Sequence, residues 1–210
     1  MPLRDDADRV LYYAPRTRSF TALWLLEELG LPFRIAEVDL QAGAQKTPEF
    51  LALNPMGKVP VVVEDGIPIA ELGALAITLA DRHSGAGLAV GIDAPQRPAY
   101  LRWMFFSSAI MEPAFGEKFF RWEVPASSVA WGSFADMHRA LDGAVEPGPY
   151  LLGDRFTAAD VLVGSTARFG LMFGAFEAGG PIDRYVQRLA ARDAFQAAAA
   201  IEAQRAPPPQ

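Results

Sequence analysis

Three hydroxyl side chains, Tyr12, Thr17 and Ser19, stand close together just ahead of an apolar segment with helical spacing. A hydroxyl can donate a hydrogen bond to an anion, and the free N–H groups of a helix N-terminus also favour negative charge. Each residue has a structural interpretation as well, because Thr17 or Ser19 can cap the helix and Tyr12 can be a core tyrosine at a strand end. A cap at the rim of an anion site can serve both purposes.

A second stretch that bears on chemistry runs from residue 54 to residue 80, NPMGKVPVVVEDGIPIAELGALAITLA. Val59 to Val63 is β-branched and apolar apart from Pro60, which favours a buried strand, and Asp65-Gly66 forms a tight turn into a second strand. Pro60 cannot donate to a strand ladder and belongs at a strand's first residue. The Val59-Pro60 bond is therefore a candidate cis bond that would turn the peptide groups of Val59 toward a ligand, although a hairpin with a trans proline is the alternative.

The elements that must position these residues follow from hydrophobic spacing and turn residues. A helix is predicted to end at Gly30, where a C-cap is expected, and a right-handed β-α-β crossover then makes the first two strands parallel. The expected elements are strand 10–13, helix 19–29, strand 33–38, an irregular connection 39–50 with a possible short helix, strands 59–63 and 67–70, and helix 72–82. This order suits a small mixed sheet with helices on both faces.

The second half of the chain is predicted to be helical. A Gly-, Ala- and Pro-rich linker covers residues 84–98, and helices are expected at 99–122 with an interruption near Pro113, then at 127–145, 157–173, 182–191 and 194–203. The domains predicted from this pattern are 1–83, a linker 84–98, an all-helical domain 99–205 and a disordered tail 206–210. Thr157 and Asp160 have capping-box spacing, flanked by the apolar pair Phe156 and Val161, and we interpret Asp160 as structural rather than catalytic.

Composition narrows the class of protein. Apolar residues make up 51% of the 210 residues and charged residues 21%, as in an ordinary globular protein. The formal net charge of −6 argues against a nucleic-acid or anionic-membrane partner. Cysteine is absent and only His83 and His138 are present, which disfavours disulfides, a cysteine nucleophile and a metal site. The opening nine residues are acidic and lack an apolar core, so we expect no signal peptide and a cytoplasmic location.

Together, the N-terminal segment and the 54–80 stretch resemble the thioredoxin-like domain of bacterial glutathione transferases, close to the serine/threonine-type classes, and the resemblance extends over nearly the full length. It implies an α/β thioredoxin-like N-terminal domain plus an all-α C-terminal domain, the glutathione transferase fold. It also implies that Pro60 is cis and that Val59 pairs its backbone with the cysteinyl part of glutathione, the expected co-substrate. The implied protein is a homodimer active in detoxification, without a metal.

The resemblance further implies that glutathione must be ionised to attack an electrophile. A free thiol has a pKa of about 8.5, and lowering it by about two units requires roughly 2.7 kcal/mol in favour of the thiolate. One or two charge-assisted hydrogen bonds supply that amount. Thr17 matches the position of the hydroxyl in serine-type members, with Ser19 nearby, and Tyr12 matches the tyrosine-type position. Arg18 occupies the position of the reactive cysteine of a bacterial class, which excludes that class's mechanism.

Other glutathione contacts come from the same resemblance. Glu71 matches the acid that receives the γ-glutamyl ammonium, but Leu72 stands where the family usually has a serine, which leaves only its backbone amide for the γ-glutamyl carboxylate. Lys46 and Lys58 match positions near the glycine carboxylate, where Gln45 replaces a basic residue. As alternatives, Glu71 is a first-turn acid favoured by the helix dipole and each lysine is simply solvated.

The expected activity is conjugation of the glutathione thiolate to a hydrophobic electrophile. Most aromatic and soft residues of the long helical segment are expected in the core, and some to line an apolar pocket for the electrophile; they are Tyr100, Trp103, Met104, Phe106, Phe119, Phe120 and Trp122. The alternatives are a glutathione-dependent peroxidase and a non-catalytic binding protein of the same fold. Leu72 favours the non-catalytic alternative slightly, whereas Glu71, Pro60 and the hydroxyl-bearing loop favour the enzyme.

Overall fold

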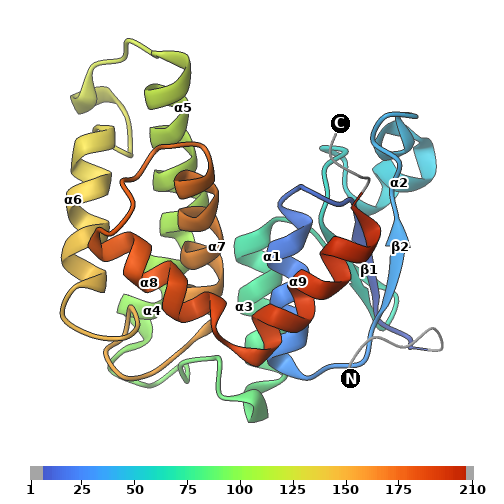
Figure 1. Cartoon of the computed structure of the whole chain (residues 1–210). Helices are drawn as coiled ribbons and strands as arrows, with labels where there is room; N and C mark the ends of the chain where they lie inside the picture. Colours follow the sequence, from blue (N-terminus) through green and yellow to red (C-terminus); the bar gives the residue numbers. More distant parts are fainter. Residues whose placement is uncertain (1–6, 207–210) are drawn as a thin grey trace. The chain divides into compact units, whose positions relative to one another are not determined.

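The computed structural model describes residues 7–206 of the chain. Residues 1–6 and the end of the tail, 207–210, on which the predictions about a signal peptide and a disordered terminus partly rest, lie outside the described residues. Two compact units are present, one made of residues 7–86 and 192–206 and the other of residues 87–191. Figure 1 shows the elements of both units. Between residues 7 and 206, no helix combines the length and the apolar character that crossing a bilayer requires.

The first unit is built on a four-stranded mixed sheet in the order β2-β1-β3-β4. Its strands are β1 (Val10–Tyr13), β2 (Arg34–Glu37), β3 (Val61–Glu64) and β4 (Ile67–Ile69). β1 runs parallel to β2 and antiparallel to β3, which in turn pairs antiparallel with β4. The expected β-α-β and β-β-α order and the thioredoxin-like fold are therefore confirmed.

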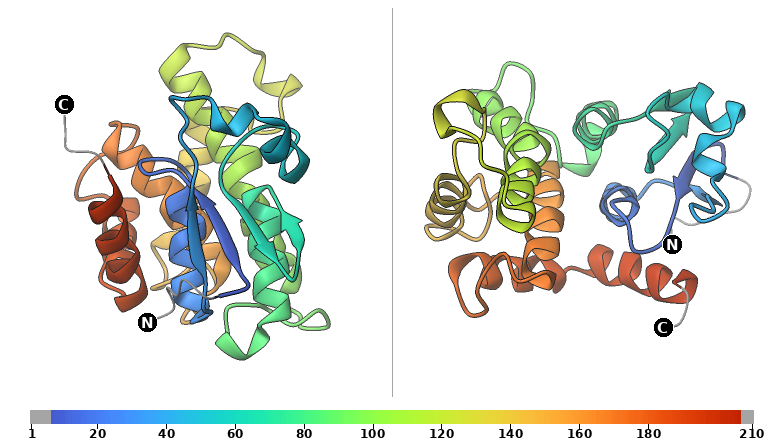
Figure 2. Two further views of the ribbon diagram at one scale, coloured as in Figure 1. Left: turned by 90° about the vertical axis from the view of Figure 1, so that its right-hand side faces the viewer. Right: turned by 90° about the horizontal axis from the view of Figure 1, so that it is seen from above.

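Helices cover both faces of this sheet. The helical segments of the unit are α1 (Ser19–Leu29), η1 (Ala44–Lys46), α2 (Pro48–Leu53), α3 (Leu72–Arg82), η2 (Ser84–Ala86) and α9 (Asp193–Arg205). α1 and α3 lie on one face, and the η1–α2 segment lies on the other (Figure 2). α1 ends where the sequence predicts, since Gly30 adopts the left-handed conformation with φ of 63° and its N–H bonds back to the helix.

The C-terminal helix α9 packs on α1 (Figures 1 and 2). The ring of Phe195 makes edge contacts with Phe20 and Trp24, with centroids 5.3 and 5.1 Å apart. Arg192 adds a two-pronged ion pair to Glu28, with nitrogen–oxygen distances of 2.6 and 2.8 Å. The chain thus returns to its first unit after the helical one. The predicted domains, 1–83 and 99–205 with a linker at 84–98, stay a prediction.

The second unit is a bundle of helices, as expected. Its segments are α4 (Arg97–Phe106), the π-helix η3 (Ser107–Met111), α5 (Glu112–Phe120), η4 (Ala126–Ser128), α6 (Phe134–Val145), α7 (Ala158–Met172) and α8 (Pro181–Ala190). The long predicted helix is interrupted, but by the π-helix that precedes Pro113. Pro113 itself lies at the start of α5, directly after the π-helix. A buried hydrogen bond of 2.7 Å joins the hydroxyls of Ser107 in η3 and Thr166 in α7.

The predicted capping box at the start of α7 is confirmed. The Asp160 carboxylate accepts hydrogen bonds from the N–H of Thr157 and, 9 residues away in sequence, the N–H of Leu151, both at 2.9 Å. The hydroxyl of Tyr185 donates to the same carboxylate at 3.0 Å. Burial raises the pKa of Asp160 despite these donors, and its side chain is fully enclosed. Asp160 therefore joins α7, α8 and the preceding loop, which agrees with a structural role.

A second buried carboxylate, that of Glu64 at the end of β3, joins three elements of the sheet unit. Arg9 beside β1 donates to it through Nε at 2.8 Å, and Nη1 of Arg82 in α3 donates at 3.0 Å. Nε2 of His83 lies 2.8 Å from the same group. Burial opposes ionisation of Glu64, but the hydrogen bonds from Arg9, His83 and Arg82 outweigh it and lower its pKa to about 2.

Candidate functional site

The loop between β1 and α1 holds two of the predicted hydroxyls together. Thr17 Oγ1 donates to the carbonyl of Ala14 at 2.7 Å, and it lies 3.0 Å from Ser19 Oγ. Thr17 Oγ1 also accepts from the N–H of Ser19, the first residue of α1, at 3.1 Å. The N-cap position itself falls on Arg18, whose side chain makes no capping hydrogen bond. The loop hydroxyls thus form a small network at the helix start without occupying the N-cap position.

The two loop hydroxyls differ in access. Ser19 is fully buried, and its Oγ accepts from the N–H of Ala14 at 3.3 Å, whereas Thr17 is half-buried. A hydroxyl has one proton to donate, so Thr17 must turn from the Ala14 carbonyl before it can donate to an external anion. That exchange costs about 1 kcal/mol and is recovered when the new acceptor is charged. Thr17 is therefore the less buried hydroxyl-bearing residue of the pair.

The third hydroxyl, that of Tyr12, belongs to a different environment. The Tyr12 ring makes an edge contact with Phe50 of α2 at a centroid distance of 5.9 Å and packs against the buried cluster of Val38, Phe50 and Val61. Val59 packs against the same cluster. Tyr12 and Val59 therefore share the sheet face that α2 covers, and the structure brings them together.

The loop that leads into β3 has the backbone features expected from sequence. The Val59-Pro60 bond is cis. Among the described residues, the backbone of Val59 makes no loop or turn hydrogen bond with other backbone, and β3 begins only at Val61. Asn54 supports this loop, because its Nδ2 donates to the carbonyl of Lys58 at 2.9 Å and its Oδ1 accepts from Met56 N at 3.1 Å.

Glu71 lies at the start of α3 in a backbone conformation that is unusual for a residue with a Cβ. Its φ is 63° and its ψ is 119°, and its side chain is exposed. Such conformations cost free energy and concentrate at functional sites. Leu72 follows as the first residue of α3, so its N–H is one of the free donors of the helix start. A carboxylate and a free N–H donor thus stand side by side at this helix end.

The two lysines predicted near the glycine carboxylate both lie at the loop that precedes the cis bond. Lys46, at the end of η1, donates through Nζ to the carbonyl of Met56 at 3.0 Å. Gly57 permits this approach, since a Cβ there would lie 2.7 Å from Lys46 Nζ, and its φ is 59°. Lys58 is exposed and follows directly. Lys46 therefore touches the chain that leads to the cis bond, and Lys58 belongs to it.

Comparison with known proteins identifies the arrangement. Residues 9–77 match the family domain described as "Glutathione S-transferase, N-terminal domain". Glutathione S-transferase 3 of Zea mays is 30% identical over 187 residues, which cover 82% of this chain and 84% of that protein. The chain belongs to the glutathione transferase family. Disulfide-bond oxidoreductase YfcG of Escherichia coli is 27% identical over 164 residues, 72% of this chain and 75% of that protein.

Solved structures of this family have the same fold. A glutathione transferase from Methylococcus capsulatus is 30% identical, with a TM-score of 0.77 over 93% of this chain and 99% of that chain. A glutathione transferase homolog from Sulfitobacter, solved with bound glutathione, is 28% identical, with a TM-score of 0.74 over 92% of this chain and 97% of that chain. The family resemblance expected from the sequence is confirmed, while the serine/threonine class stays a prediction.

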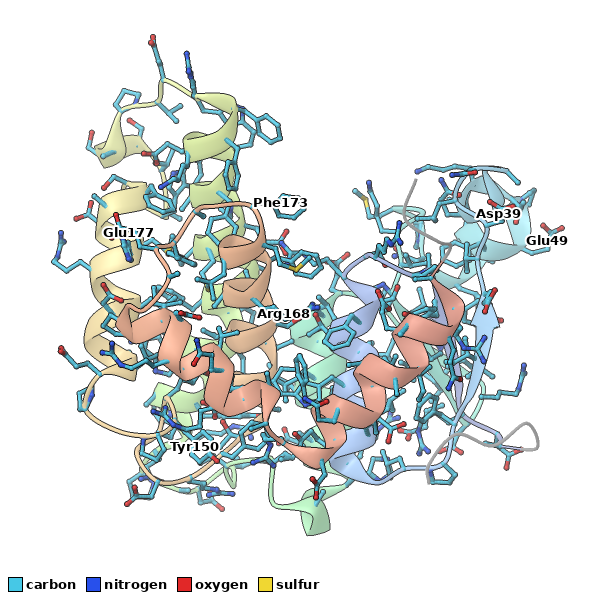
Figure 3. All side chains as sticks on the ribbon, viewed as in Figure 1. Asp39, Glu49, Tyr150, Arg168, Phe173 and Glu177 are labelled. Atoms are coloured by element: carbon cyan, nitrogen blue, oxygen red, sulfur yellow. The ribbon has the colours of Figure 1, made fainter. Side chains whose placement is uncertain are left out.

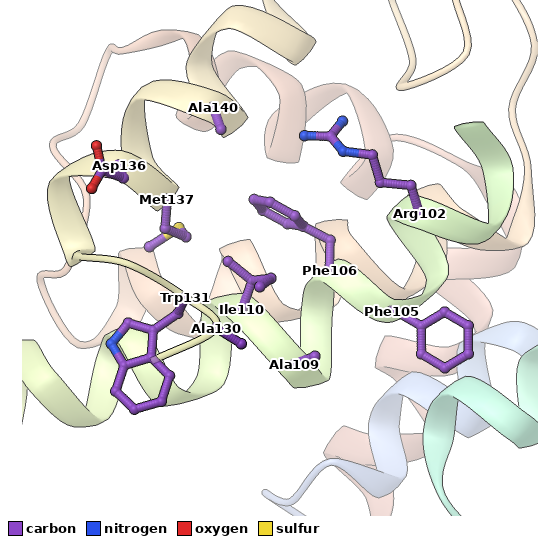
Figure 4. Close-up of a pocket in the computed structure, with 10 residues that line it drawn as sticks. All are labelled: Arg102, Phe105, Phe106, Ala109, Ile110, Ala130, Trp131, Asp136, Met137 and Ala140. Carbon is purple, nitrogen blue, oxygen red and sulfur yellow. The ribbon is translucent and has the colours of Figure 1, made fainter. Parts of the chain in front are cut away.

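The helical unit of this family member contains an apolar pocket of about 440 Å³ between α4–η3 and α6 (Figure 4). Phe106, Ile110, Trp131 and Met137 line it, and Arg102 lies at its edge. The Arg102 guanidinium lies 4.3 Å from the centroid of the Trp103 ring. A pocket of this size and character suits a small apolar molecule.

Of the seven aromatic and soft residues predicted for the core or the pocket, some are buried and others are exposed. Tyr100, Trp103, Met104 and Phe106 are buried, whereas Phe119, Phe120 and Trp122 are exposed beyond the usual range for a core. Phe173, at the end of α7, is also exposed (Figure 3). Within residues 7–206, no cluster of three or more His, Asp or Glu side chains is arranged to hold a metal ion.

The sequence did not predict one contact of the loop between β1 and α1. The N–H of Arg16 donates to Glu202 Oε1 of α9 at 2.7 Å. These residues are 186 positions apart, and neither carries a local pattern that would predict the pairing. In the structure, the left-handed backbone conformation of Arg16, with φ of 58°, marks this position as unusual.

Proposed function

We propose that this protein is a glutathione transferase that joins the thiolate sulfur of glutathione to an electrophilic carbon of a hydrophobic substrate. The sulfur–carbon bond forms as a leaving group departs with its electron pair, or as a double bond accepts the pair and then a proton. The observation that carries the proposal is the half-buried Thr17, whose hydroxyl lies at the start of α1, in a chain whose family and fold match glutathione-bound relatives.

Glutathione binding is assigned to the sheet unit. The backbone of Val59 would pair with the cysteinyl residue of glutathione, as an added strand pairs with a sheet edge. Glu71 would receive the γ-glutamyl ammonium, and the N–H of Leu72 the γ-glutamyl carboxylate. Lys46 and Lys58 would attract the glycine carboxylate. The exposed Glu71 side chain at a strained backbone position and the placement of Lys46 on the Met56 carbonyl support these assignments.

The thiol would be ionised by the β1–α1 loop. A hydrogen bond from Thr17 to the sulfur anion contributes about 1.5–3 kcal/mol, which is the amount needed to lower a thiol pKa by one to two units. The first-turn N–H groups of α1 add a smaller stabilisation of the anion. Tyr12 is the rival donor, because its ring packs against the same buried cluster as Val59. We favour Thr17 because it stands at the start of α1.

A second reaction is favoured by the similarity to the Escherichia coli disulfide-bond oxidoreductase. The chain contains no cysteine, so both thiols in such a reaction would come from glutathione. One glutathione thiolate would attack a disulfide and release a thiolate, and a second would attack the mixed disulfide to give oxidised glutathione. This reaction uses the same thiolate site, and so would glutathione-dependent peroxide reduction.

The experiment that tests the proposal is turnover by the purified protein of an aromatic halide, a small disulfide and a hydroperoxide, each with glutathione. Glutathione binding is measured in parallel by calorimetry. Conjugate formation confirms a transferase, and oxidised glutathione alone assigns the oxidoreductase or peroxidase reaction. Absence of binding at millimolar glutathione contradicts all three and leaves a non-catalytic protein of this fold. We also infer a homodimer and a cytoplasmic location from the family. Light scattering tests the first and cell fractionation the second.

A further inference from the structure

We propose that Glu202, on the C-terminal helix α9, is a positioning residue for the loop that carries Thr17. Its carboxylate holds the backbone N–H of Arg16 and thereby fixes the turn that presents the Thr17 hydroxyl. The inference rests on the proposed function for its catalytic consequence, but the contact itself is a property of the sheet unit alone.

The turn needs an external partner because of its backbone conformation. Arg16 has a φ of 58°, a region that residues with a Cβ rarely adopt and that costs free energy of order 1 kcal/mol or more. Thr17 follows immediately, and its hydroxyl network with Ala14 and Ser19 depends on where this turn places it. A hydrogen bond of 2.7 Å from the Arg16 N–H to a carboxylate oxygen is a strong restraint on the turn.

The burial of the Glu202 carboxylate is consistent with a specific contact to the Arg16 N–H. Its second oxygen, Oε2, is buried and has no hydrogen-bond partner among the described residues. Burying a carboxylate oxygen in this way is unfavourable, and burial accordingly raises the pKa of Glu202. A glutamate on a solvated helix would normally turn both oxygens to water. Glu202 instead keeps one oxygen on the Arg16 N–H at that cost.

α9 is anchored well enough to act as the support for this contact. Phe195 packs against Phe20 and Trp24 two turns before Glu202, and Arg192 pairs with the nearly buried Glu28. In the last turn, Arg205 pairs with Glu37 of β2. The helix is therefore fixed to α1 and the sheet on either side of Glu202. Glu202 can restrain Arg16 only because these contacts hold α9 in place.

The contact can be tested without activity, through hydrogen exchange of the Arg16 amide in the full-length protein. Glu202→Ala should speed exchange of this amide by on the order of tenfold or more, because the carboxylate oxygen that accepts its hydrogen bond is lost. Glu202→Gln keeps a carbonyl oxygen and should change it little. Gln204→Ala, at an exposed position of the same helix, is the matched control. Equal exchange in Glu202→Ala and Gln204→Ala would overturn the proposal.

The catalytic consequence is tested by the thiol pKa of bound glutathione and by kcat. Glu202→Ala should move that pKa toward its free value and lower kcat by about tenfold, with KM for glutathione changed less than about twofold. Arg16→Gly removes the strain of the left-handed turn, so the double variant Arg16→Gly/Glu202→Ala should regain most of the lost kcat. A merely structural role would lower thermal stability without this split between kcat and KM.

Each failure has its own signature. If wild-type protein forms no glutathione thiolate, the proposed function fails, while the Arg16 exchange result still decides the contact. If wild type forms the thiolate and Glu202→Ala leaves its pKa and kcat unchanged, the positioning role is wrong. Should Glu202→Ala not fold, wild type, Glu202→Gln and the double variant are compared instead. A folded double variant whose kcat lies about tenfold below that of wild type contradicts the proposal.

Discussion

The hydroxyl oxygens of Thr17 and Ser19 lie 3.0 Å apart at the start of α1, yet Ser19 is buried and Thr17 only half-buried. Ser19 is fully buried and accepts from the N–H of Ala14, so its part is to support the loop. Thr17 can exchange its bond to the Ala14 carbonyl for one to an external anion. The pair thus combines a fixed residue with one whose hydroxyl proton can turn toward an anion at the helix start.

Removing the charge of Glu64 should weaken the fold and alter its acid stability. Its pKa is about 2 in the folded protein against an ordinary value of 4.5, which corresponds to about 3 kcal/mol of stability. Because the folded pKa is the lower one, this contribution is complete above pH 4.5 and is lost as the pH falls toward 2. Glu64→Gln should therefore lower the free energy of unfolding by about 3 kcal/mol at neutral pH.

The measurement is urea unfolding of wild type and Glu64→Gln at neutral pH and at several acidic pH values. The difference between the two proteins should shrink as the pH falls below 4.5. Glu49→Gln, an exposed carboxylate of the same unit, serves as the control (Figure 3). A difference that stays constant down to the lowest pH would show that the charge of Glu64 is not what stabilises the fold.

Restoring a hydroxyl at Leu72 should tighten glutathione binding. Leu72 is the first residue of α3 and offers a carboxylate only its N–H. Leu72→Ser would add a second donor at the same helix start and should lower the Kd for glutathione about fivefold, the equivalent of one net hydrogen bond. Calorimetry on Leu72→Ser and on Leu72→Ala, which removes the side chain without adding a donor, measures this. Equal Kd values for glutathione in the two variants would show that the γ-glutamyl carboxylate does not bind at this helix end.

Filling the pocket of the helical unit should exclude apolar ligands from it. Ala109 lines the pocket from η3, while its neighbour Ser108 is exposed and does not. Ala109→Trp should weaken binding of an anilinonaphthalene sulfonate dye by about tenfold or more, since a large side chain occupies the space that the dye needs. Ser108→Trp should bind the dye as wild type does. Dye fluorescence measures both, and equal weakening by the two substitutions would place the dye elsewhere.

Much of the fold could be predicted because its signals are local. Val10–Tyr13, Ser19–Leu29 and Leu72–Arg82 agree with the expected elements residue by residue, since apolar spacing and Gly30 mark their ends. The cis bond before Pro60 followed from a family pattern around one proline. The sequence predicts an interruption near Pro113 but not its π-helical form, in which Ser107 bonds to Thr166 of a helix distant in sequence.

The parts that escaped prediction are held by contacts distant in sequence. Glu202 meets Arg16 across 186 positions, and Arg192 meets Glu28 across 164. The charge cluster around Glu64 joins Arg9 across 55 positions. Neither hydrophobic spacing nor a short motif encodes which distant polar residues will meet, since that depends on how the elements pack. The candidate site residues were found through the family pattern, whereas the residue proposed to position them was not.

The most direct test of the account is the thiol pKa of glutathione bound to wild type and to Thr17→Ala, followed by thiolate absorbance across pH. We predict a pKa about two units below the free value of about 8.5 in wild type and a return of at least one unit in Thr17→Ala. Thr17→Ser should behave as wild type, and Tyr12→Phe should change the pKa little. An unchanged pKa in Thr17→Ala with a raised pKa in Tyr12→Phe would transfer the role to Tyr12. A pKa that moves in neither variant would contradict activation by these hydroxyls.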